Sequence, residues 1–147
     1  MFIYRGGRLL KIIFSDFPES FELELLKIVR SGGDDNIKYV LAVLRNYEGE
    51  SFIHGVCKEV IMAVPEESPL LTEVAVALMS TGVVAGEFGM AEAYERKANE
   101  VRDWLTDPDE KVKAFAESFI DQMEKMSAAD RRRAEERIEL RKHQYGE

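Results

Sequence analysis

Apolar residues recur every three or four positions along most of this chain, which is the spacing of one face of an α-helix. Gly, Pro or a potential capping residue stands near almost every boundary between these patterns. The pattern therefore predicts an all-α protein. We expect helices over 18–30, 35–48, 51–64, 68–81, 90–105, 106–123 and 127–144.

The clearest of these patterns runs from Thr106 to Met123. Asp107 is placed to cap the helix, Pro108 follows where a missing N–H does no harm, and Glu110 can complete a capping box. The apolar residues that follow this helix start fall on one face, which we expect to be buried against the preceding helix: Val112, Phe115, Ala116, Phe119, Ile120 and Met123.

The expected helices also form pairs. Helix starts near residues 35, 69 and 108 are 34 and 39 residues apart, a period typical of two-helix solenoid repeats. The last expected helix begins with a second capping-box pattern, Ser127 and Asp130. Its apolar face is thin, as expected of a helix that caps a stack of repeats: Ala134, Ile138, Leu140 and Tyr145.

The segment WLTDPDEKVKAFA, residues 104–116, resembles the first helix of a HEAT-type repeat. The wider run 81–116 looks like the C-terminal helical region of large, poorly characterised bacterial proteins. This resemblance implies stacked antiparallel helix pairs, a HEAT-like α-solenoid or right-handed superhelix, with a terminal capping helix. It also implies a scaffold or recognition surface within the C-terminal part of a larger bacterial protein.

Residues 1–15 leave two alternatives open. Gly6-Gly7 could form the turn of a hairpin, while RLLKIIF, residues 8–14, has the paired apolar spacing of a short helix. We favour a short helix or an extended arm. Residues 16–147 are then expected to form a single helical-repeat domain.

Composition restricts the function. The 28 acidic and 20 basic residues leave a formal net charge of −8, which disfavours general binding to a phosphate backbone. No apolar run approaches the ~20 residues of a membrane helix. Cys57 is the one cysteine, so no internal disulfide can form. We expect a cytoplasmic protein without a membrane partner.

Sequence motifs for catalysis or metal binding are missing. His54 and Cys57 are three residues apart, but no second His/Cys cluster could complete a zinc site. The glycine loop around Glu87 lacks the Lys-Ser/Thr pair of a P-loop. No nucleophile stands in a recognisable frame with a histidine. We therefore expect no enzyme activity and no cofactor, and we place Cys57 in the core.

The expected binding site is a helix face. In paired-helix stacks the second helices line a concave surface, here helices 51–64, 90–105 and 128–144. Polar residues that point outward on them are candidates for contact with another protein or another domain of a larger chain: His54, Lys58, Glu92, Arg96, Asn99 and Asp103.

A nucleic-acid-binding accessory domain is the alternative function. It would use the basic residues of the last helix: Arg131, Arg132, Arg133, Arg137, Arg141 and Lys142. Between Ser127 and Glu147, however, these 6 basic residues accompany 5 acidic ones. Ion pairs at i,i+4, such as Arg131 with Glu135 and Arg132 with Glu136, favour an ordinary solvated helix. Nucleic acid is therefore the less favoured partner.

Overall fold

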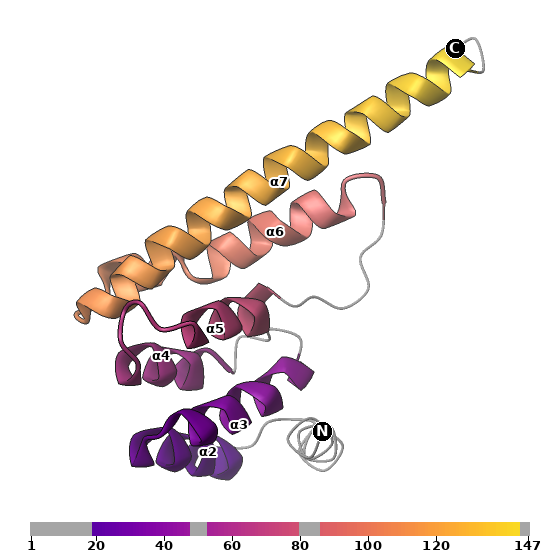
Figure 1. Ribbon diagram of the computed structural model, residues 1–147. Coiled ribbons are helices and arrows are strands. Elements are labelled where there is room, and N and C mark those ends of the chain that lie inside the picture. The colour runs from indigo at the N-terminus through magenta and orange to yellow at the C-terminus, as the bar shows by residue number, and fades with distance from the viewer. Residues whose placement is uncertain (1–18, 48–52, 80–85, 145–147) are drawn as a thin grey trace.

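The computed structural model describes residues 19–47, 53–79 and 86–144 (Figure 1). Every regular element in these ranges is a helix, so the predicted all-α class is confirmed for them. The expectations for residues 1–15 and for Tyr145 lie outside the described residues. The elements are α2 (Glu19–Ser31), α3 (Asp34–Leu44), η1 (Arg45–Tyr47), α4 (His54–Ala63), α5 (Leu70–Met79), α6 (Gly89–Glu100), η3 (Arg102–Thr106) and α7 (Glu110–Gln144).

The helices follow one another through the molecule in chain order. In Figure 1, α2 and α3 lie at one end, α4 and α5 in the middle, and α6 and α7 at the other end. α2 contacts α3 and α4, α3 contacts α5, and α4 contacts both α5 and α7. α4 is therefore covered by helices from both neighbouring layers.

Two glycines end α2 where the sequence predicts its end. Gly32 and Gly33 adopt φ angles of 79° and 89°, in the region that side chains with a Cβ atom rarely enter. The N–H of Gly32 donates to the carbonyl oxygen of Val29 at 3.1 Å, and α3 begins at Asp34. The chain can thus reverse within two residues.

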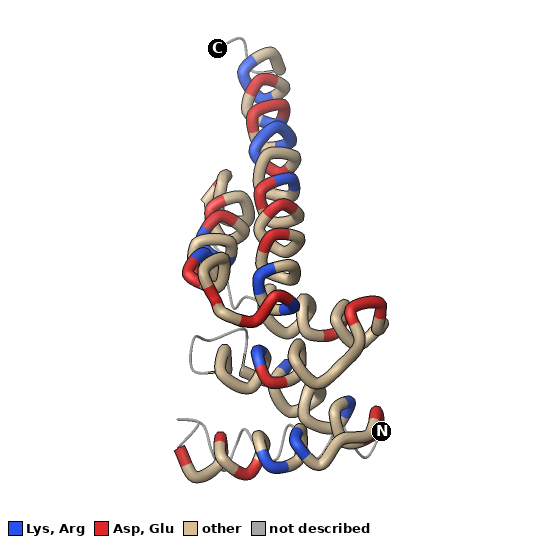
Figure 2. Tube along the Cα trace, turned by 90° about the vertical axis from the view of Figure 1, so that its left-hand side faces the viewer, with Lys and Arg blue, Asp and Glu red and all other residues tan. Residues whose placement is uncertain are grey.

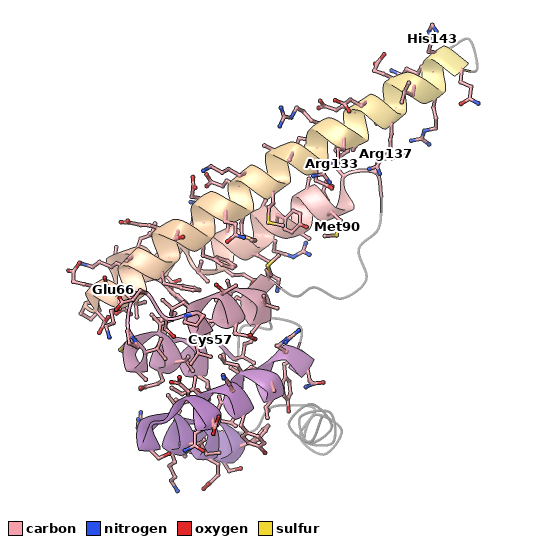
Figure 3. The ribbon with its side chains drawn as sticks, viewed as in Figure 1. Cys57, Glu66, Met90, Arg133, Arg137 and His143 are labelled. Carbon is pink, nitrogen blue, oxygen red and sulfur yellow. The ribbon has the colours of Figure 1, made fainter. Side chains whose placement is uncertain are left out.

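The apolar residues that recur at helical spacing in the second and third expected helices form much of the core. None of these residues is more than 3 % exposed: Ile37, Val40, Leu41, Leu44, Ile53, Val56, Cys57, Val60, Ile61 and Val64. Cys57, labelled in Figure 3, is fully buried in this core, and its burial raises the pKa of its thiol to about 12. The thiol therefore stays protonated at neutral pH and packs as a small apolar group.

The prediction of two separate helices, 106–123 and 127–144, is wrong. One helix of 35 residues, α7, runs from Glu110 to Gln144. Ser127, predicted to cap a helix, is 3 % exposed inside α7, and its hydroxyl donates to the carbonyl oxygen of Ala91 in α6 at 2.9 Å. The residues around Ser127 include neither Gly nor Pro, so nothing local breaks the helix.

The helix boundaries on either side of Trp104 also differ from the predicted ones. Asp109, rather than Asp107, caps α7, because its Oδ1 accepts from the N–H groups of Lys111 at 2.8 Å and Val112 at 3.3 Å. The expected helix 90–105 ends at Glu100 and continues as η3. Trp104 is buried there, whereas its neighbour Leu105 is 36 % exposed.

α6 and α7 form an antiparallel pair in which the 12-residue α6 lies along the middle of the 35-residue α7, and α7 extends beyond it (Figure 1). Small residues let the helices approach, since Ala91, Ala98 and Ala134 are fully buried. Toward the C-terminal end, Ile138 is only half-buried and Leu140 is 68 % exposed. Leu140 is therefore not part of an apolar packing face in this structure.

The two phenylalanines of α7 should differ in their effect on stability. Phe119 is 2 % exposed, whereas Phe115 is half-buried, and their rings stack at 5.9 Å. We expect Phe119→Ala to lower the free energy of unfolding by about 3–5 kcal/mol, and Phe115→Ala by clearly less, because Phe119 loses almost fully buried contacts whereas Phe115 is already partly exposed. Urea unfolding of both variants measures this, and a larger loss for Phe115→Ala would contradict it.

Candidate functional site

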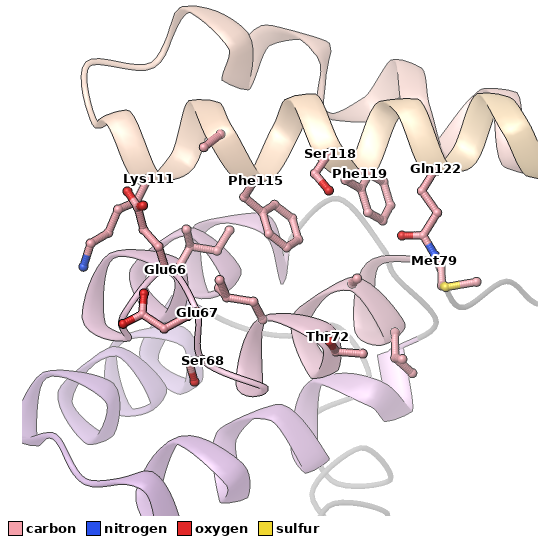
Figure 4. A pocket seen from close by; sticks show the side chains of 15 residues that line it. Glu66, Glu67, Ser68, Thr72, Met79, Lys111, Phe115, Ser118, Phe119 and Gln122 are labelled. Carbon is pink, nitrogen blue, oxygen red and sulfur yellow. The ribbon is translucent and has the colours of Figure 1, made fainter.

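A groove lies between α5 and the first turns of α7 (Figure 4). Its volume is about 570 Å³. Figure 4 shows Phe115 and Phe119 directed from α7 toward α5, with Gln122 and Met79 at the far end. Most of the wall is apolar and comes from both helices: Leu71, Ala75, Val76, Met79, Ala114, Phe115 and Phe119.

The groove stays open because of the way the helices pack. The opposite side of α5 is buried, with Leu70, Val74 and Leu78 at most 4 % exposed. α5 packs mainly on α3, α4 and α6, whereas α7 packs on α4 and α6. One flank of α5 therefore faces one flank of α7, but the two flanks do not pack against each other.

Sequence reasoning missed this groove. The apolar pattern of the fourth expected helix, 68–81, includes Leu71 and Ala75, but both are only half-buried. Their spacing identifies an apolar flank correctly. Whether such a flank is covered depends on where the next helix crosses, and periodicity carries no information on that.

Charged residues stand at the end of the groove where α5 and α7 begin. Glu66 and Glu67 are exposed, and neither has an ion-pair partner within the described ranges. Lys111 lies beside them, but its Nζ donates to the carbonyl oxygens of Val64 at 3.0 Å and Met62 at 3.3 Å. The ammonium group is thus held at the C-terminal end of α4, and the lining at this end of the groove carries two negative charges against one positive charge.

Two of the six predicted face residues, His54 and Lys58, are packed against η3. Their side chains are 15 % and 31 % exposed. The His54 ring meets the Trp104 ring edge-on at 5.5 Å, and Lys58 Nζ lies 3.1 Å from Asp107 Oδ2 and 5.3 Å from the centre of the Trp104 ring. Both side chains therefore belong to the junction between α4 and η3.

The other four predicted face residues, Glu92, Arg96, Asn99 and Asp103, are exposed along α6 and η3. Asn99 Oδ1 accepts a hydrogen bond from Arg102 Nε at 2.8 Å. The structure thus leaves these four open to solvent and separates them from the two packed residues of α4.

His54 has an unusual environment for a histidine. Burial lowers its pKa, the nearby charges of Lys97 and Lys58 lower it further, and Asp103 opposes the shift. Its Nε2 is buried without a hydrogen-bond partner within the described part of the chain, 4.0 Å from Glu100 Oε2. The folded protein therefore favours the neutral ring.

Most basic residues of α7 are engaged with carboxylates. Arg131 pairs with Glu95 of α6 at 2.8 Å, rather than with Glu135 as predicted, and it holds the pKa of Glu95 down. Three further pairs are Arg133 with Asp130, Arg141 with Glu87, and Lys142 with Glu139. Arg132 and Arg137 are exposed. Acidic and basic residues alternate along α7 in Figure 2. Figure 3 labels Arg133, Arg137 and His143 on the C-terminal half of this helix.

Within the residues that the structure describes, no group of three or more His, Cys, Asp or Glu side chains could hold a metal ion. The described helices also include none with the length and apolar character needed to cross a membrane.

Comparison of the chain with models of known protein families, with curated proteins and with solved structures finds no match. The resemblance to HEAT-type repeats therefore stays a prediction.

The His54 environment predicts a pH-dependent stability. Between about pH 7.5 and 5.5 the unfolded chain takes up a proton at His54, whereas the folded protein resists it, so stability should fall as the pH falls. His54→Gln should flatten the dependence of the unfolding free energy on pH in this window. His143→Gln is the control, because His143 is exposed near the end of α7. Urea unfolding across this range would contradict the assignment if His54→Gln kept the wild-type slope.

The ion pairs along α7 predict weak or no affinity for nucleic acid. We expect no saturable binding of a fluorescent DNA duplex or single-stranded RNA at low salt, because carboxylates already neutralise most of the basic residues. Fluorescence anisotropy measures this. Binding that weakens steeply as salt rises, and that disappears when Arg131, Arg132 and Arg133 are changed to Glu, would instead establish the alternative function.

Proposed function

We propose that this chain is a non-catalytic helical-repeat module that binds another protein, or another domain of a larger chain, and acts as a cytoplasmic scaffold. The observation that carries the proposal is the groove between α5 and α7, whose apolar walls come from two helices and are left open. Half-exposed apolar side chains between two helices offer the kind of groove into which a helix of another polypeptide can dock.

The proposed architecture is a HEAT-like stack of helix pairs. Contacts of α2 with α4 and of α3 with α5 support it, because equivalent helices of successive repeats stack in this way. The last pair, α6 and α7, departs from that order. α4 is contacted by α7 in place of α6, and α5 is contacted by α6 in place of α7. This departure exposes the flank of α5, so the irregularity of the stack and the proposed binding surface have one origin.

A capture experiment with matched variants tests the proposal. Leu71→Asp places a charge in the groove, whereas Leu23→Asp places the same charge on α2, where Leu23 is 49 % exposed. We expect at least one protein from the source cells to be retained by the wild type and by Leu23→Asp but lost by Leu71→Asp. Quantitative mass spectrometry of captured proteins measures this, after urea unfolding has shown that both variants fold.

Two results would contradict the proposal. One is that no protein is enriched over a beads-only control. The other is that every enriched protein is retained equally by the wild type and both variants, because the groove would then play no part in the interaction.

A further inference from the structure

We infer that the groove binds an amphipathic helix of a partner protein, which runs antiparallel to α5 and α7 and carries basic residues in its last turn, over Glu66 and Glu67. This inference rests on the proposed function and adds the kind of partner and its orientation.

The walls of the groove favour a helix as the occupant. Both walls are helices, whose backbone N–H and C=O groups are already paired within each helix, so an extended peptide would find no edge to extend. A helix can instead contact both walls with side chains at i, i+4 and i+7. α5 itself offers Leu71, Ala75 and Met79 at i, i+4 and i+8 along one flank.

The length of the groove limits the length of the contact. Leu71 and Met79 are eight residues apart on α5, which corresponds to about 12 Å or just over two helical turns. Phe115, Phe119 and Gln122 cover a similar span of α7. The occupant therefore needs only about three turns, with two or three apolar anchors.

Charge selects the direction of the bound helix. α5 and α7 both begin at the Glu66–Glu67 end, so their positive N-terminal dipoles favour the negative C-terminus of a bound helix there. Glu66 and Glu67 add two full negative charges, while Lys111 is engaged by the carbonyl oxygens of Met62 and Val64. These carboxylates repel the negative C-terminus of a bound helix, so the orientation requires basic side chains in its last turn, which pair with Glu66 and Glu67 and offset that repulsion. At the other end, near Met79 and Gln122, none of the described lining residues is charged.

Two synthetic peptides of identical composition can test the orientation. Each has about three turns with leucines at i, i+4 and i+7, and a Lys-Arg pair stands either in the last turn or in the first. We expect the full chain to bind the peptide with the C-terminal basic pair about five- to tenfold more tightly, as two favourable surface ion pairs allow. Fluorescence polarisation with labelled peptides measures the two dissociation constants.

Charge reversal in the protein provides the matched variants. Glu66→Lys with Glu67→Lys should abolish the preference for the C-terminal basic pair. Glu135→Lys with Glu136→Lys should preserve it, because this exposed pair lies about 20 Å further along α7 than Gln122. Equal affinity of the two peptides, a preference that survives the Glu66 and Glu67 changes, or no binding of either peptide would overturn the inference.

Evidence that something other than a partner helix occupies the groove would also overturn the inference. If Leu10→Asp with Ile13→Asp in the full chain strengthened binding of both peptides about tenfold, residues 8–14 of this chain would be the occupant. If the wild type were a dimer in sedimentation and Leu71→Asp made it a monomer, the occupant would be a second copy. A third result would separate the two proposals. If neither peptide bound but captured proteins were still lost from Leu71→Asp, the proposed function would be supported and only the helical partner would be rejected.

Discussion

Burial of α4 is the constraint on which the rest of the structure depends. The apolar residues on its inner side are no more than 1 % exposed, and helices α2, α5 and α7 contact it. Each such aliphatic side chain contributes about 1.5–3 kcal/mol when it leaves water. A helix this thoroughly covered determines where its neighbours lie. The position of α7 on α4, in particular, decides which flank of α5 is left uncovered.

α7 connects this core to a part of the molecule with different packing. Its first half contributes Val112, Ala116 and Phe119 to the apolar interior, while its second half is held against α6 through small residues and polar contacts. The buried hydroxyl of Ser127 and the ion pair of Arg131 with Glu95 join the two helices. Exposed ion pairs contribute only about 0–1 kcal/mol each, so the pair of Arg131 with Glu95 adds little to this pairing.

The charge distribution supports a protein rather than a nucleic acid as partner. The basic residues of α7 are dispersed among carboxylates, and several pair with them. Glu66 and Glu67, in contrast, lie beside the open groove. Since His54 and Lys58 pack on η3, two of the six predicted contact residues contribute to the junction of α4 with η3. The open apolar surface lies elsewhere, between α5 and α7.

The sequence by itself determined the helical class, the buried stripes of α3 and α4 and the turn at Gly32 and Gly33. All of these depend on residues within a few positions of one another, through side-chain periodicity and allowed backbone angles. The sequence around Ser127 permits a continuous helix, but the tertiary structure decided the role of Ser127, because the partner of its hydroxyl is Ala91, 36 residues away in the chain. The tertiary structure also decided the burial of His54 and the opening of the groove beside Leu71. Both follow from how distant helices cross, and the crossing is set by the packing of whole helix surfaces rather than by the pattern within one helix.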